Sequence, residues 1–199
     1  MEPETQTRTL REQATYSGAE RWRNCPASVA MSAGIEEGEK KYASEGTKAH
    51  KKAAKALIEN TPLEDIDDEA VREYVAMVRR LADPPYHVEE RLPLLGSSGG
   101  LDCYTISGKI GSIFDFKYGV GIRLQAYENE QLAGYACCLK EKYPQITQVF
   151  CVLSQPRVEG VFEETSSFST WTLGYQALAA WRRKFEAALE EVEKAQRIN

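Results

Sequence analysis

The chain has 199 residues, of which 42% are hydrophobic and 28% are charged, and its formal net charge is -5 at pH 7. This composition is that of an ordinary globular domain, and the negative balance argues against a protein that coats nucleic acid through bulk positive charge. The sequence has no apolar run of the ~20 residues that a membrane span requires. The polar N-terminus and five cysteines without a CxxC pair suit a cytoplasmic protein with reduced thiols.

The first part of the chain is predicted to be helical. Residues 1–13 are expected to form a flexible segment, followed by one folded domain over 14–199. Apolar residues at helical spacing, together with the proline after Cys25, predict three helices. They are Ala19–Met31 with an interruption at Cys25–Pro26, Thr47–Asn60, and Asp68–Leu81.

After Pro84 and Pro85 the pattern changes to alternation, which is typical of strands. The strands predicted in this way are Tyr86–Leu95, Leu101–Ile106, Ile110–Lys117 and Gln148–Leu153, with a flexible turn over 96–100. Helices are predicted over Asn129–Lys142 and, as a long closing element, Thr172–Arg197. The order of elements indicates an α/β (α+β) fold in a single domain, with a mixed central sheet flanked by helices.

Two aspartates are expected to face each other across a hairpin. Gly108 suits the first central position of a two-residue type II′ turn, which would pair Ser107 with Ile110 and therefore Asp102 with Asp115. Their Cβ atoms would then lie roughly 5 Å apart on one face. A three-residue loop would shift this register by one. Opposed carboxylates repel, and Mg²⁺ or Mn²⁺ would offset the repulsion.

Lys117 follows Asp115 by two residues, so both project from the same face of the strand, opposite Phe114 and Phe116. The ordinary interpretation is an ion pair on a half-solvated strand, and the alternative is a metal ligand beside a catalytic cation. A second aspartate on this face favours the alternative, because metal and lysine together suit phosphodiester hydrolysis. The carbonyl of Phe116 could also reach the metal.

Two helices supply further candidates. His50 shares a helical face with Ala53 and Leu57 and should point inward, either as a satisfied core histidine or as a metal ligand. Gln131 and Tyr135 are four residues apart and project from one face of their helix, a pair that by itself is typical of a core edge.

Five motifs occur in order along the chain: Glu45–His50, Val88–Glu89, Gly100–Asp102, Asp115–Lys117 and Gln131–Tyr135. In this order they resemble the PD-(D/E)XK nuclease superfamily, in particular its RecB-like and lambda-exonuclease-like branch encoded by phages and prophages. Arg21–Ser28 and Ser154–Arg157 also resemble motifs of a phage-associated branch. The resemblance covers about residues 17 to 160.

The resemblance implies a restriction-endonuclease-like core that cleaves DNA with Mg²⁺ or Mn²⁺. Its implied metal ligands are His50, Asp102, Asp115 and the Phe116 carbonyl, with Glu89 at a second metal position. Its implied catalytic residues are Lys117, Asp102, Asp115, Gln131 and Tyr135, and Glu45, Gln131 and Tyr135 would contact DNA. The sequence leaves open which of Glu89 and Glu90 faces the site.

A terminal phosphate of the DNA is expected near a short helix start. Arg21, Arg23 and Ser28 there combine guanidinium groups, a hydroxyl and free backbone N–H groups, which suit a phosphate. The alternative is a solvated, charged helix start. Lambda-exonuclease-like relatives bind a terminal phosphate in this region, which favours the phosphate site.

The function expected from the resemblance is an exonuclease of phage recombination or DNA repair, in the cytoplasm of a bacterium or a phage-infected host. A restriction-type or structure-specific endonuclease is the alternative enzyme, and a non-catalytic DNA-binding protein on a nuclease fold is the alternative class. The expected partner is DNA; a single-strand annealing or other recombination protein and a homo-oligomer are further candidates. No iron–sulfur cluster is expected, because Cys137 and Cys138 are adjacent on a helix and point in different directions.

Overall fold

The computed structural model of the protein describes residues 8–33, 41–158 and 167–195. The helices in this part are α1 (Leu10–Gln13), α2 (Ala19–Asn24), α3 (Ala27–Ser32), α4 (Lys41–Ile58), α5 (Glu69–Leu81), α6 (Glu130–Lys142) and α7 (Tyr175–Ala195), with 3-10 turns at Tyr16–Gly18 and Leu63–Asp65. The strands are β1 (His87–Leu94), β2 (Ser97–Ser107), β3 (Ile110–Phe116), β4 (Gln148–Ser154) and β5 (Phe168–Gly174).

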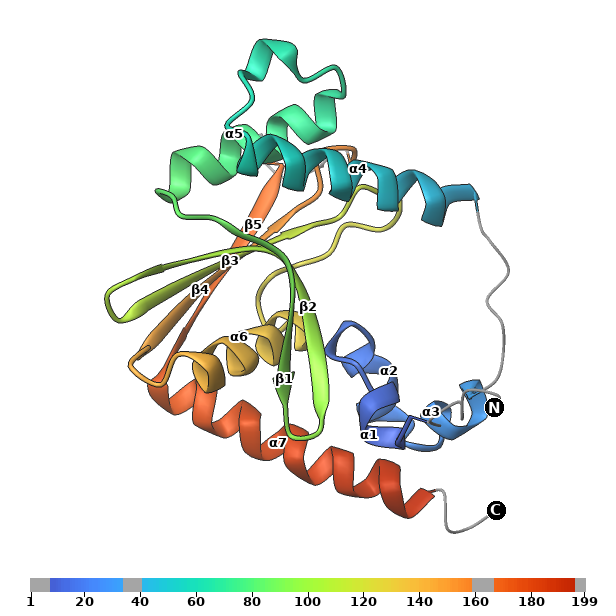
Figure 1. Ribbon diagram of the computed structural model, residues 1–199. Helices are drawn as coiled ribbons and strands as arrows, with labels where there is room; N and C mark the ends of the chain where they lie inside the picture. Colours follow the sequence, from blue (N-terminus) through green and yellow to red (C-terminus); the bar gives the residue numbers. More distant parts are fainter. Residues whose placement is uncertain (1–7, 34–40, 159–166, 196–199) are drawn as a thin grey trace, which may run out of the picture.

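The five strands form one mixed sheet in the order β1-β2-β3-β4-β5 (Figure 1). β1, β2 and β3 are antiparallel neighbours, β4 runs parallel to β3 after the crossover through α6, and β5 returns antiparallel to β4. Helices α4 and α5 cover one face of the sheet, whereas α6 and α7 cover the other (Figure 1). The predicted fold class, a mixed central sheet flanked by helices in one domain, is therefore confirmed.

Each face of the sheet has its own hydrophobic core. On the α6–α7 face, Tyr16, Trp22 and Phe185 are fully buried and pack ring against ring, at centroid distances of 5.0 to 6.0 Å. On the α4–α5 face, Tyr74 stacks on Phe116 at 4.5 Å and donates a hydrogen bond to the carbonyl of Phe114. Phe114 and Phe116 thus point into the core, as predicted, and Asp115 projects to the opposite face.

Two predictions about the ends of the chain were wrong in part. Residues 10–13 of the expected flexible segment form α1, because the Thr9 side chain caps its first turn and Leu10 is buried; residues 1–7 lie outside the described part. The closing helix begins at Tyr175 instead of Thr172, because Phe168–Gly174 pairs with β4 as an edge strand that the sequence analysis missed.

The predicted flexible turn over 96–100 was also wrong. The turn consists of Leu95 and Gly96, and Ser97–Gly100 already belongs to β2, paired with β1. Gly99 is needed there for packing: a Cβ atom at this position would come within 2.6 Å of the ring of Tyr135. In the part of the chain that the structure describes, no helix has the length and apolarity to cross a membrane.

Candidate functional site

The hairpin of β2 and β3 has the predicted register. Ser107 pairs with Ile110 and Cys103 with Phe114, and Gly108 has a φ of 58° as the turn requires. Asp102 and Asp115 follow next on their strands. The β2–β3 ladder ends at Cys103 and Phe114, so the direct opposition of the two carboxylates stays a prediction; Asp102 is bonded to His50 and Asp115 to Lys117.

The sheet changes direction at Asp102. Leu101 packs in the core on the α6–α7 face, whereas Cys103, which by strand alternation should share that face, packs in the core on the α4–α5 face. Opposite this point the β1–β2 ladder is interrupted at Glu89, whose φ of 50° lies in the left-handed region. A non-glycine residue there costs about 1–3 kcal/mol, and such strain is concentrated at functional sites.

His50, Glu89 and Asp102 converge at this bend, with one ligand atom of each within 4.8 Å of the others. His50 Nδ1 lies 3.1 Å from Asp102 Oδ1 and 3.6 Å from Glu89 Oε1. Burial lowers the pKa of His50, but the hydrogen bonds with Asp102 and Glu89 outweigh it and raise the pKa to about 10. Without a bound metal ion, the imidazole of His50 is therefore cationic at neutral pH and offsets the charge of the two carboxylates; a metal ion on this imidazole would displace the proton.

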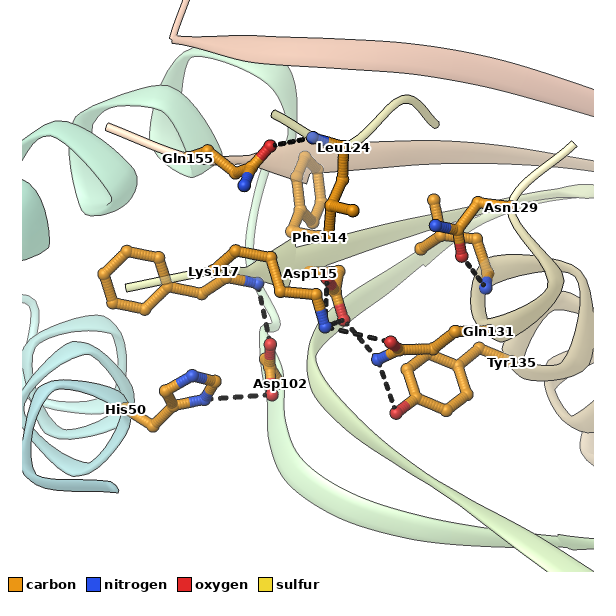
Figure 2. Close-up of polar contacts among 12 residues, drawn as sticks. His50, Asp102, Phe114, Asp115, Lys117, Leu124, Asn129, Gln131, Tyr135 and Gln155 are labelled. Atoms are coloured by element: carbon orange, nitrogen blue, oxygen red, sulfur yellow. Dashed lines mark hydrogen bonds and ion pairs between the residues drawn. The ribbon is translucent and has the colours of Figure 1, made fainter. Parts of the chain in front are cut away.

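Asp115 contacts Lys117, two residues further along the chain, and Gln131 of α6 (Figure 2). It is 2% exposed, and its Oδ1 accepts a hydrogen bond of 2.8 Å from Gln131 Nε2. Lys117 Nζ lies 3.0 Å from Asp115 Oδ2 and donates to Gln131 Oε1 at 2.9 Å. Gln131 Nε2 also donates to the hydroxyl of Tyr135. The first turn of α6 thus fixes the aspartate and the lysine of β3 relative to each other.

Burial and charge act on this pair in opposite directions. Burial raises the pKa of Asp115, and the nearby charge of Asp102 adds to it, while Lys117 lowers it. For Lys117, burial lowers the pKa, but the charges of Asp115 and Asp102 raise it to a net value above the ordinary one. Lys117 is therefore a fixed cation at neutral pH, and the repulsion expected between the aspartates is offset by Lys117 and His50.

Members of both groups line one pocket of about 400 Å³, whereas Glu89 and Tyr135 lie outside its lining. Its walls include His50 from α4, Asp102 from β2, Asp115 and Phe116 from β3, and Gln131 from α6. Asp115 Oδ2 is buried there, and its contact with a described residue is the ion pair with Lys117. Carboxylate oxygens and an imidazole are ligands that fit Mg²⁺ or Mn²⁺.

The structure answers the question about the two neighbouring glutamates. Glu89 turns to His50, whereas Glu90 accepts a hydrogen bond of 2.5 Å from the hydroxyl of Tyr104 and forms an ion pair with Lys142. The Phe116 carbonyl as a ligand stays a prediction; the N–H of Phe116 donates to Asp102 Oδ2 at 2.7 Å.

With this geometry established, a comparison with protein families gives one match. Residues 13–70 and 63–196 match the model of a family described as "Protein of unknown function (DUF2800)". The chain belongs to this family. The match extends over both faces of the sheet and every candidate residue discussed above, so the pocket lies within the part that matches the DUF2800 model.

The residues predicted to bind a terminal phosphate lie outside this pocket, in the α2–α3 corner (residues 19–32). Arg21 donates to the Ser32 hydroxyl, and Arg23 forms an ion pair with Glu130 and lies over the ring of Trp181. The hydroxyl oxygen of Ser28 is buried without a partner among the described residues. The phosphate site remains a prediction, with one of its two arginines neutralised by a carboxylate.

Glu45, expected to contact DNA, is half-buried near the start of α4, and its charge acts on the phenol of Tyr118. That position is outside the pocket lining, which α4 supplies through Gly46 and His50. A role for Glu45 in binding DNA stays a prediction.

Sequence reasoning missed the function of Gln155, a buried side chain at the end of β4. Its amide oxygen accepts a hydrogen bond of 2.6 Å from the N–H of Leu124, so it fixes the β3–α6 connection beside the pocket (Figure 2). The available signal was the Ser154–Arg157 motif, in which a polar side chain directly follows a buried strand.

Proposed function

We propose that this protein is a metal-dependent DNA nuclease that hydrolyses phosphodiester bonds, acting as an exonuclease. The observation that carries the proposal is the pocket in which Asp102, Asp115 and Lys117 meet, with His50 beside them. A half-buried lysine fixed next to two carboxylates suits a reaction that develops negative charge on phosphate oxygens.

His50, Asp102 and Asp115 would hold Mg²⁺ or Mn²⁺, with Glu89 close enough to His50 and Asp102 to bind a second ion. Such an ion, when bound, would activate a water molecule and neutralise charge on the phosphate. The bend supports this arrangement, because ligands from β1, β2 and α4 come together only where the strands change direction.

Lys117 would stabilise the negative charge that builds on the phosphate in the transition state. Gln131 holds the ammonium group through its amide oxygen and Asp115 through its amide nitrogen, so both reach the substrate in a fixed orientation. The hydroxyl of Tyr135 accepts a hydrogen bond from the amide nitrogen of Gln131 and thereby holds the Gln131 side chain in its rotamer.

Digestion of linear and circular duplex DNA with Mg²⁺ or Mn²⁺ tests the proposal. An exonuclease degrades only the linear form, an endonuclease cleaves both, and a DNA-binding protein without catalysis leaves both intact. Asp115→Asn is the matched variant, because it keeps the shape of the side chain and removes its charge. Cleavage by this variant at the parent rate would contradict the assignment of the pocket.

A further inference from the structure

The connection between β3 and α6 exposes apolar side chains at the pocket. Within eight residues, Val120 is 60% exposed, Ile122 88%, Leu124 39% and Tyr127 67%. Single exposed apolar residues are common on protein surfaces, whereas apolar side chains gathered at one place mark an interaction site, and Ile122 and Leu124 lie together in one pocket lining. We call residues 118–127 the apolar loop.

The apolar loop forms part of the wall of the candidate site. Ile122 and Leu124, together with two of its glycines, line the same pocket as Asp115 and Lys117. A molecule whose phosphate enters this pocket would therefore have its neighbouring groups against the loop.

The exposure is imposed by the structure, because the loop is fixed at several points. Gln155 Nε2 donates to the Ile122 carbonyl at 3.2 Å while its oxygen accepts from Leu124 N–H. Arg157 donates to the carbonyl of Tyr118 and lies 4.4 Å from the centre of its ring. The Ser154–Arg157 segment, which the proposed reaction does not use, thus holds the backbone so that Ile122 projects outward.

The composition of the loop indicates what it contacts. Contacts to the DNA backbone are made mostly by lysine, arginine and polar groups, and the loop has one charged residue, Arg123, among ten. The faces of unpaired bases pack against apolar side chains and stack on aromatic rings such as that of Tyr118, which also lines the pocket, whereas in a duplex the faces are covered by neighbouring bases.

We propose that the apolar loop binds unpaired nucleobases of the strand whose phosphate enters the pocket. This inference rests on the proposed nuclease function and adds its substrate class: a DNA strand that is single-stranded, or melted, next to the scissile phosphate. Ile122 is the central contact, and Gln155 and Arg157 are positioning residues for the loop.

Fluorescence anisotropy with the full chain tests the proposal without cleavage. The probes are a fluorescein-labelled single-stranded oligonucleotide and the corresponding blunt duplex, in EDTA. Ile122→Ser should weaken binding of the single strand by about fivefold or more, because an aliphatic side chain that a base covers is removed from water, and leave duplex binding within about twofold of the parent. Ile122→Trp should bind the single strand at least as tightly as the parent.

Ile58→Ser is the matched control, because Ile58 is 67% exposed at the end of α4 and outside the pocket lining. Single-strand binding by Ile122→Ser equal to that of the parent, an equal loss with Ile58→Ser, or no binding of either probe by the parent would overturn the proposal. If the parent protein binds single strands through Ile122 but cleaves no DNA with Mn²⁺, the proposed nuclease function is wrong, whereas the proposed base-binding surface is supported.

Discussion

The pocket at the bend of the sheet and the α2–α3 corner both contain the charged residues expected of a DNA-binding site, but they use them differently. In the pocket, side chains from α4, β2, β3 and α6 surround a cavity, and the buried carboxylate of Asp115 is ion-paired with Lys117 at its edge. In the corner, Arg21 is bound to Ser32 of the next helix and Arg23 to Glu130. The arginines of the corner are thus already used to join helices.

The cations are paired within the protein in both regions: Lys117 with Asp115 in the pocket, and Arg23 with Glu130 in the corner. The difference lies in the surroundings, because the pocket groups border a cavity that a ligand can enter, whereas the corner arginines join neighbouring helices. Residue type and spacing do not reveal this difference. Variants of the pocket should therefore change cleavage, metal binding or stability more than a variant of the α2–α3 corner.

Lys117→Ala should have the largest effect. Loss of one fixed group that stabilises transition-state charge lowers a rate by about 100- to 1000-fold, and DNA binding should change far less, because the interaction is strongest in the transition state. Single-turnover cleavage and anisotropy measure the two quantities. Lys52→Ala, which removes an exposed lysine paired with Asp67, is the control and should cleave at the parent rate. An equal loss of binding and cleavage in Lys117→Ala would point to a structural role.

Mn²⁺ should stabilise the parent by linkage, because only the folded protein assembles the ligands. At a hundred times the dissociation constant the gain is about 2.7 kcal/mol, or roughly 5–10 °C in Tm for a chain of this size. His50→Ala and Asp102→Asn should lose most of this shift in a thermal melt. Asp67→Asn, which removes an exposed carboxylate, should retain it. If His50→Ala only lowers Tm and keeps the Mn²⁺ shift, His50 is a core residue and no ligand.

Gln131→Ala should destabilise the protein even without metal. The variant removes hydrogen bonds to the buried charged pair Asp115 and Lys117, and bonds to charged groups contribute about 1.5–3 kcal/mol. Urea unfolding in EDTA measures the loss. Gln176→Ala changes an exposed glutamine in the first turn of α7 and should leave the free energy of unfolding nearly unchanged. Equal stability of both variants would mean that the network around Asp115 is not held by Gln131.

Arg21→Ala should have the smallest effect. If the α2–α3 corner binds a terminal phosphate, the ratio of cleavage rates for 5′-phosphorylated and unphosphorylated ends should fall, by about fivefold or less for one exposed charge. Arg183→Ala is the control, because it removes an exposed arginine on α7, and it should leave this ratio unchanged. Equal rates on both ends in the parent would exclude the corner from end recognition.

Much of the sheet could be predicted because the relevant signals are local. Alternation along β3 placed Phe114 and Phe116 in the core and Asp115 on the opposite face, and Gly108 fixed the register of the hairpin. The starts of two helices were also predicted correctly, at Asp68 from the apolar spacing and at Asn129 from its capping side chain.

The remainder depended on tertiary contacts. Strand alternation reverses at Asp102, opposite the left-handed backbone of Glu89, and no sequence pattern indicates such a backbone for a glutamate. Arg23 pairs with Glu130 and Asp102 with His50, on elements far away in the sequence, so spacing alone could not show these pairings. β5 was missed because its pairing with β4 is a long-range contact.

The most direct test of the account is an anomalous difference map from a crystal soaked in Mn²⁺. If the pocket binds metal, a peak should lie inside it, within about 2.5 Å of carboxylate oxygens of both Asp102 and Asp115. This peak should be absent from crystals of Asp115→Asn grown and soaked in the same way. An empty pocket in the parent, with Mn²⁺ found only at exposed carboxylates such as Asp67, would contradict the claim that this pocket is a metal-dependent site.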